Sequence, residues 1–153
     1  MLNKVDAIVI DGCALLWSVH WPQQGTVKDY VDNFIRNVML KAKDSEVYLT
    51  FDRYYDYSIK SVTRGARGGK HATRQHHLNL SSPLPPQAVV LQVHANKLQL
   101  IDIICDHLVE LCVTSGEPTH NKIVVCGRDP IPIELFCGYQ IHRRDLMKKR
   151  TSL

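Results

Sequence analysis

Three aspartates follow stretches of strand-forming residues, and their spacing is the first feature of the chain that suggests chemistry. Asp11 ends the run K-V-D-A-I-V-I-D, Asp52 ends E-V-Y-L-T-F-D, and Asp129 stands just past the stretch K-I-V-V-C-G. Carboxylate oxygens are the ligands that Mg²⁺ and Mn²⁺ prefer. Two such ions held about 4 Å apart can activate a water and stabilise the leaving oxygen in phosphodiester hydrolysis. The three aspartates are therefore candidate metal ligands.

The first third of the chain predicts the elements that would bring these carboxylates together. Residues 4–11 and 46–52 form near-continuous apolar runs, which are typical of strands covered on both faces. Between them, Thr26 and Asp29 stand in the relation of a capping box and start a helix whose apolar residues recur at helical spacing. Strand, helix and strand in this order predict a right-handed βαβ unit with parallel strands, so the carboxyl ends of the strands share one edge of the sheet.

The remainder of the chain continues the α/β pattern. A long apolar stripe over residues 98–112 predicts a second helix that ends near Gly116, and residues 122–127 predict a third buried strand. The proline-rich segment at 82–86 precedes the short apolar stretch A-V-V-L-Q-V, which we expect to be an extended edge segment. We expect a single domain over residues 1–153, with the proline-rich segment as a linker inside it.

A purely structural interpretation of the aspartates has equal standing. An aspartate at the end of a strand is common because its side chain caps turns and the helix that follows, and Asp11-Gly12 is a frequent turn dipeptide. One such aspartate would carry no information about function. Three aspartates at equivalent strand ends favour a metal site more strongly than one aspartate does.

Basic residues are concentrated in two places, although the net charge is only +4. The stretch from Lys60 to Arg74 contains five basic residues, three glycines and no acid, and the end of the chain reads H-R-R-D-L-M-K-K-R. Such clusters favour binding to nucleic acid through release of counterions. Taken alone, each cluster is more typical of a solvated loop or tail than of a binding site.

Composition and cysteine usage indicate an ordinary globular protein. The 153 residues are 44% hydrophobic and 22% charged, and no apolar run approaches the length of a membrane span, so we expect no membrane partner. The first residues lack the uninterrupted apolar core of a secretory signal, and the five cysteines contain no C-x-x-C pair. We expect an intracellular protein, in the cytoplasm or nucleus, with reduced thiols.

The stretches I-V-I-D-G-C-A-L-L-W and V-Y-L-T-F-D-R-Y-Y-D-Y-S-I-K-S-V-T-R carry a resemblance to known proteins. They resemble the N-terminal core of the PIN-like and flap-endonuclease-type 5′ nucleases. The stretches G-T-V-K-D-Y-V-D-N-F, N-K-L-Q-L-I-D-I-I-C and I-H-R-R-D-L extend the similarity to the N-terminal part of long animal proteins that look derived from mobile elements and are mostly uncharacterised. This resemblance implies a three-layer fold with a mostly parallel central sheet and flanking helices, incomplete at its C-terminal end.

The resemblance also implies roles for individual residues. Asp11 and Asp52 match the first two acidic positions of the nuclease core, which bind Mg²⁺ or Mn²⁺. In the basic loop over residues 60–86, Lys60, Arg64 and Arg67 match the segment that helps grip the scissile phosphate in the 5′ nucleases. Three further basic residues are expected to contact nucleic acid; they are Arg53, Lys70 and Arg74. Further acids that complete the metal cluster in the longer relatives have no counterpart here. Two carboxylates offset only half of the charge of two divalent ions, unless Asp129 or Asp56 contributes.

We therefore expect a truncated nuclease-type domain. It would be weak or inactive as a metal-dependent phosphodiesterase and would retain nucleic-acid binding. The alternatives are a non-enzymatic protein-interaction module and a non-functional remnant of a mobile element. An unfinished sheet would also leave an unpaired edge strand that is prone to self-association.

Overall fold

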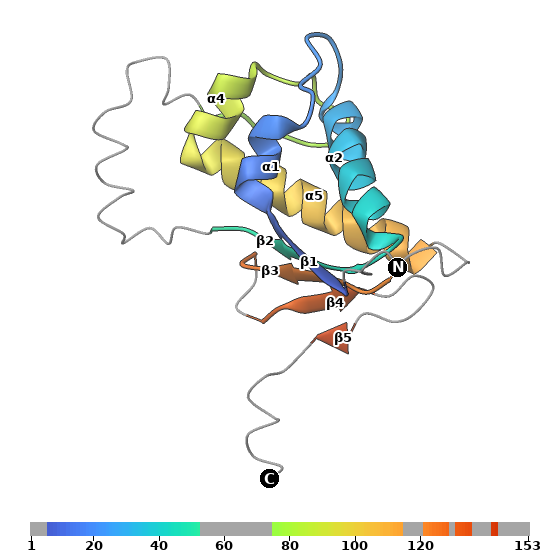
Figure 1. The fold of residues 1–153 in the computed structure, drawn as a ribbon. Helices are drawn as coiled ribbons and strands as arrows, with labels where there is room; N and C mark the ends of the chain where they lie inside the picture. The colour runs from blue at the N-terminus through green and yellow to red at the C-terminus, as the bar shows by residue number, and fades with distance from the viewer. Residues whose placement is uncertain (1–5, 53–74, 115–120, 129–130, 136–141, 144–153) are drawn as a thin grey trace.

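A computed structural model describes residues 6–52, 75–114, 121–128, 131–135 and 142–143. Within these residues, five strands form one sheet in the order β1-β2-β3-β4-β5 (Figure 1). Their bounds are β1 Ala7–Asp11, β2 Glu46–Thr50, β3 Ile123–Cys126, β4 Ile133–Leu135 and β5 His142–Arg143. Strands β1, β2 and β3 are parallel, whereas β4 and β5 are antiparallel to their neighbours. The expected α/β class and the parallel β1–β2 and β2–β3 pairs are confirmed, but the sheet is mixed rather than mostly parallel.

Four helices accompany the sheet in the described part of the chain. They are α1 Gly12–Ser18, α2 Val27–Ala42, α4 Gln87–Gln92 and α5 His94–Thr114. Figure 1 shows all four on the same face of the sheet, so the described residues form two layers rather than the expected three. The prediction that the early strands are covered on both faces is wrong for β1, because its residue Val9 is 73% exposed on the face away from the helices. The apolar sequence of β1 therefore does not mean that both faces of the strand are buried.

Helix α2 has the start that its sequence predicts. The Thr26 side chain accepts a hydrogen bond from Asp29 N, and the Asp29 carboxylate accepts one from Thr26 N at 2.8 Å, which completes the capping box. Inside the helix, Tyr30 is fully buried, and its hydroxyl donates to Leu16 O at 2.7 Å. Burial raises the pKa of Tyr30 above its ordinary value. This hydrogen bond ties α2 to α1 across the core.

The segment over residues 75–86 lies along the start of α2. Val27 N donates to Ser82 O and Lys28 N donates to Leu80 O, both at 2.9 Å. Leu84 N donates to Gly25 O at the same distance. The first N–H groups of a helix have no partner within the helix, and here backbone carbonyls from a distant segment provide one. The described part of the loop predicted over 60–86 is thus fixed against the helical layer.

Two amide side chains of α5 hold the other side of the same segment. The Asn96 side chain accepts from His76 N at 2.8 Å and donates to Val89 O at 3.1 Å. The Gln99 side chain accepts from Leu78 N at 3.0 Å and donates to His76 O at 2.7 Å. Asn96 is completely buried, so these hydrogen bonds take the place of those that its amide group would make to water. These contacts join the segment over 75–86 to α4 and α5.

The stretch A-V-V-L-Q-V forms most of helix α4, so the prediction of an extended edge segment is wrong. Pro86 stands at the N-cap, where a residue with its fixed φ and no N–H costs nothing, and α4 buries Val90 and Leu91. Val93 has an extended backbone and separates α4 from α5. One hydrophobic cluster includes side chains from both sides of Pro86. A single domain over 1–153 stays a prediction, because parts of that range lie outside the described residues.

Candidate metal and nucleic-acid site

The parallel strands bring Asp11 and Asp52 to one edge of the sheet, as the sequence predicts. Asp11 is the last residue of β1 and is paired in register with Thr50 of β2, and Asp52 follows that strand closely. Both aspartates are exposed to solvent. The thiol of Cys13 in the first turn of α1 approaches Asp52 O at 3.9 Å, which places the two strand ends in contact. Two carboxylates are therefore available to solvent at this edge.

The structural role expected for such an aspartate is observed at Asp11. Its Oδ1 accepts hydrogen bonds from Cys13 N at 3.0 Å and Ala14 N at 3.1 Å, so Asp11 is the N-cap of α1. The sequence did not predict this short helix, because Asp11-Gly12 is also a turn dipeptide. An ionised carboxylate has two oxygens and about four acceptor positions. Capping through Oδ1 therefore leaves Oδ2 able to bind a cation.

The role of Asp11 as a helix cap leads to a prediction about stability. Replacement of Asp11 with alanine removes the acceptor for two backbone donors and should lower the free energy of unfolding by about 1 kcal/mol. Replacement with asparagine keeps a side-chain oxygen at the same place and should cost only a few tenths of that amount, since asparagine is as good an N-cap as aspartate. Urea unfolding followed by circular dichroism measures both. Equal losses for the two variants would show that the charge, and not the cap, stabilises α1.

Phe51 fixes the backbone at the end of β2. Its ring stacks on Phe34 in the core with 6.3 Å between ring centroids, and its N–H donates to Cys126 O at 2.9 Å. A Cβ atom on Gly12 would lie 2.5 Å from the Phe51 ring, and one on Gly127 would lie 1.9 Å from Phe51 O. The ends of β1 and β3 therefore need glycine, because a side chain at Gly12 or Gly127 would collide with Phe51. The position of Asp52, the next residue, depends on this packing.

A third strand end carries an ion-pair cluster that the sequence analysis missed. Arg128 follows β3 and Gly127, and its guanidinium lies 2.6 Å from the Asp106 carboxylate and 3.3 Å from that of Asp102 on α5. Burial disfavours its charge, but the two carboxylates more than offset this and raise the pKa of Arg128. The signal in the sequence is the spacing of Asp102 and Asp106, which places both on one face of a helix.

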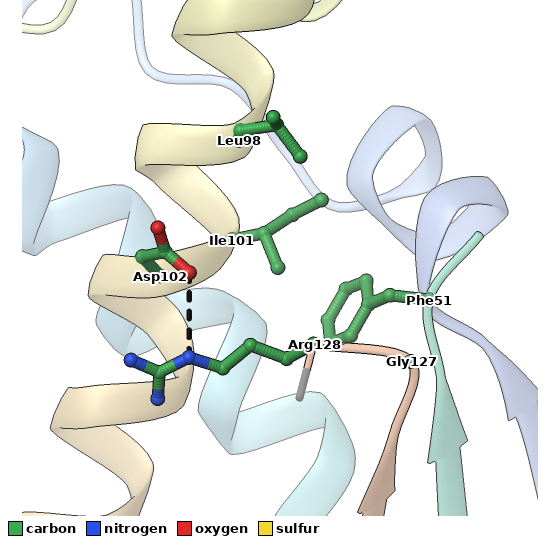
Figure 2. Close-up of a pocket in the computed structure, with 6 residues that line it drawn as sticks. All are labelled: Phe51, Leu98, Ile101, Asp102, Gly127 and Arg128. Carbon is green, nitrogen blue, oxygen red and sulfur yellow. Dashed lines mark ion pairs between the residues drawn. The ribbon is translucent and has the colours of Figure 1, made fainter. Parts of the chain in front are cut away.

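Figure 2 shows a small hollow beside this cluster. It is lined by Phe51, Leu98, Ile101, Asp102, Gly127 and Arg128. The guanidinium of Arg128 points away from Phe51 toward Asp102. The hollow has no room for a water molecule. Its lining residues thus act as packing at the junction of α5 with β2 and β3.

The described residues do not contain a complete metal centre. No group of three histidine, cysteine, aspartate or glutamate side chains able to hold a metal ion occurs within the ranges that the structure describes. The third candidate ligand, Asp129, lies outside those ranges, as do the six basic residues expected to contact nucleic acid, which are Arg53, Lys60, Arg64, Arg67, Lys70 and Arg74. Only Asp11 and Asp52 can therefore be placed.

Four cysteines lie within the described residues. Cys105 and Cys112 are buried on α5, whereas Cys13 and Cys126 are partly exposed. Burial raises the pKa of the Cys126 thiol. The expected packing of cysteines as small apolar side chains is observed for this pair on α5, whereas their reduced state stays a prediction.

Comparison with known proteins finds no match to this chain among protein-family models, curated proteins or solved structures. Among the helices that the structure describes, none is both long and apolar enough to span a bilayer. The geometry of the strand ends is thus the basis for a functional proposal.

Proposed function

We propose that this protein is a nucleic-acid-binding domain on a PIN-like α/β core, with a weak divalent-cation site at Asp11 and Asp52 and little phosphodiesterase activity. One observation carries the proposal: parallel pairing of β1 and β2 places both exposed carboxylates at the carboxyl edge of the sheet. In open α/β sheets this edge is where ligands bind. In the sequence, the chain passes from Asp52 directly to Arg53 and then to the basic stretch that begins at Lys60.

The cation site is weak for two physical reasons. Two carboxylates supply two negative charges, so they compensate one divalent ion and not the pair needed to stabilise both the attacking and leaving oxygens. In addition, Oδ1 of Asp11 is engaged as a helix cap, so only Oδ2 of this carboxylate is left to bind the ion. A single Mg²⁺ or Mn²⁺ held in this way can bridge a carboxylate to a phosphate, which strengthens binding more than it accelerates cleavage.

The primary test is the affinity for labelled single-stranded DNA, flap DNA and single-stranded RNA, measured by fluorescence anisotropy as a function of salt. Substitution of Lys60, Arg64 and Arg67 with glutamine should weaken binding by about 10- to 100-fold and reduce the slope of log K against log salt by about 2 for single strands. The matched control removes three exposed charges from α2 and its C-cap, at Arg36, Lys41 and Lys43. Equal effects of the two triple variants would overturn the proposed interface.

The cation site is tested by Asp11→Asn combined with Asp52→Asn, because asparagine at position 11 preserves the cap. Without metal, the double variant should bind the same DNA two- to fivefold more tightly, since like-charge repulsion falls. With Mn²⁺, wild type should gain affinity and the variant should not. The labelled strand should stay largely intact with either protein. Rapid cleavage by wild type that the double variant lacks would contradict the assignment of a weak site, and absence of binding at low salt would contradict the function itself.

A further inference from the structure

Strand β1 is the outer strand of the described sheet, and its register shows which of its backbone groups have no partner among the described residues. Glu46 N donates to Asp6 O at 3.1 Å, and within the part of the chain that the structure describes β1 pairs with β2 on one side only. In a parallel ladder, alternate residues of a strand bond to the same neighbour. The even-numbered residues of β1 therefore bond to β2, and Ala7, Val9 and Asp11 direct their N–H groups to the outer edge. Ala7 and Val9 also direct their carbonyls there.

The side chains along this edge are apolar where solvent-facing residues would be expected. Val9 is 73% exposed, and Ala7 is exposed beside it. Val9 is paired in register with Tyr48 of β2, which is half-buried, and Tyr48 is paired with the buried Val124 of β3. An exposed edge strand normally carries charged residues or proline to discourage pairing. Here the middle of the strand carries neither.

We propose that β1 pairs antiparallel with β1 of a second copy of this chain, with the twofold axis at Val9. In this register the N–H of each Val9 donates to the carbonyl of the other Val9, and the N–H of each Asp11 donates to the carbonyl of Ala7 in the second copy. The carbonyl of Asp11 takes no part, because the N-cap carbonyl accepts the first hydrogen bond of α1. Four main-chain hydrogen bonds join the two sheets into one.

A second copy fits this edge because the edge is complementary to itself. The outward groups of Ala7, Val9 and Asp11 lie symmetrically about Val9, which is the condition for an isologous contact. The two Val9 side chains meet on the face away from the helices, so the apolar row from Tyr48 to Val9 continues into the same row of the second copy. Asp6 and Asp11 place negative charge at the two ends of the strand. Repulsion between these charges in the two copies disfavours pairing that extends beyond residues 7–11. Because both copies use the same edge, the assembly closes as a dimer.

Sedimentation velocity over a range of protein concentrations tests the dimer. Wild type should pass from monomer to dimer, and Val9→Lys should raise the dimer dissociation constant by at least about tenfold, since it places two ammonium groups at the twofold axis. Val113→Lys is the matched control, because Val113 is 53% exposed on α5. The control should dimerise like wild type. A wild-type protein that is monomeric up to about 1 mM, or a dimer that Val9→Lys leaves intact, overturns the proposal.

Amide hydrogen exchange locates the contact independently of any variant. On dimerisation, the amides of Val9 and Asp11 should become protected, whereas those of Ile8 and Ile10 should not change because they already bond to β2. Added sodium chloride should tighten the dimer by screening the repulsion among Asp6 and Asp11 of the two copies. A dimer that weakens with salt, or that protects amides elsewhere and not these two, would place the contact on another surface.

Discussion

Replacement of Gly127 with alanine should lower the free energy of unfolding by about 4 kcal/mol, the largest loss expected for a single methyl group in this protein. Gly127 has a φ of +92°, a region that residues with a Cβ atom rarely adopt. Its Cβ position lies 1.9 Å from Phe51 O, so an alanine would also force the ends of β2 and β3 apart. Urea unfolding monitored by circular dichroism gives the loss directly.

Two further glycine variants separate backbone strain from the close contact. Asparagine tolerates positive φ better than alanine does, but it still has a Cβ atom, so Gly127→Asn should be nearly as destabilising as Gly127→Ala. A Cβ on Gly12 would meet the Phe51 ring at 2.5 Å and Thr50 O at 2.8 Å, without positive φ, so Gly12→Ala should show an intermediate loss. If Gly127→Asn recovered most of the stability, the close approach to Phe51 would not be the cause.

Replacement of Asn96 with leucine should cost about 3 kcal/mol, the second largest effect we expect from a described residue. The variant keeps a side chain of similar size and removes one acceptor and one donor, which leaves His76 N and Val89 O without this partner. A polar group left unpaired in the interior loses its water without compensation, and here two groups are affected. Chemical unfolding of the variant at neutral pH measures the loss.

The control for Asn96 is Asn37, which is half-buried on α2 and donates only to Asn33 O of the same helix, at 2.9 Å, among its hydrogen bonds within the described residues. Asn37→Leu should change the stability by less than about 0.5 kcal/mol. Asn96→Asp keeps the acceptor for His76 N and loses the donor to Val89 O, so its loss should lie between those of the other two variants. Similar losses for Asn37→Leu and Asn96→Leu would mean that the contacts of Asn96 do not matter energetically.

The βαβ unit was predictable because its signals are local. The capping box of Thr26 and Asp29, the helical spacing of apolar residues in α2 and the strand-forming runs before Asp11 and Asp52 all lie within short windows of sequence. From these, parallel pairing and a shared strand edge follow by the handedness of βαβ connections. The placement of Asp11 and Asp52 at one edge of the sheet could therefore be predicted from the sequence.

Short helices and long-range contacts were not predictable in the same way. Helices α1 and α4 span two turns or fewer, and six or seven residues of apolar character do not distinguish a helix from a strand. The docking of residues 75–86 depends on amide side chains of Asn96 and Gln99 far along the chain, for which the sequence has no local signal. Likewise, Arg128 meets Asp102 and Asp106 only because α5 crosses the end of β3.

The solvated face of β1 shows a second limit of prediction from the sequence. An apolar run predicts what a strand could bury, but whether it is buried depends on what covers each face. In β1 the residues Ile8 and Ile10 pack toward the helices, whereas Val9 between them is exposed. The sequence pattern alone is the same for a strand in the middle of a sheet and for one at its edge.

The place of β2 between β1 and β3 also has a consequence for how the chain folds. On one side β2 pairs with β1, across the connection that contains α1 and α2, and on the other side Val47 pairs with Ile123, much farther along the chain. Because distant contacts cost more chain entropy to close, the unit from β1 to β2 should assemble before β3 arrives. During that interval the inner edge of β2 is unpaired and apolar. Refolding in dilute solution, or synthesis that delivers the C-terminal strands promptly, should therefore give the higher yield of native protein.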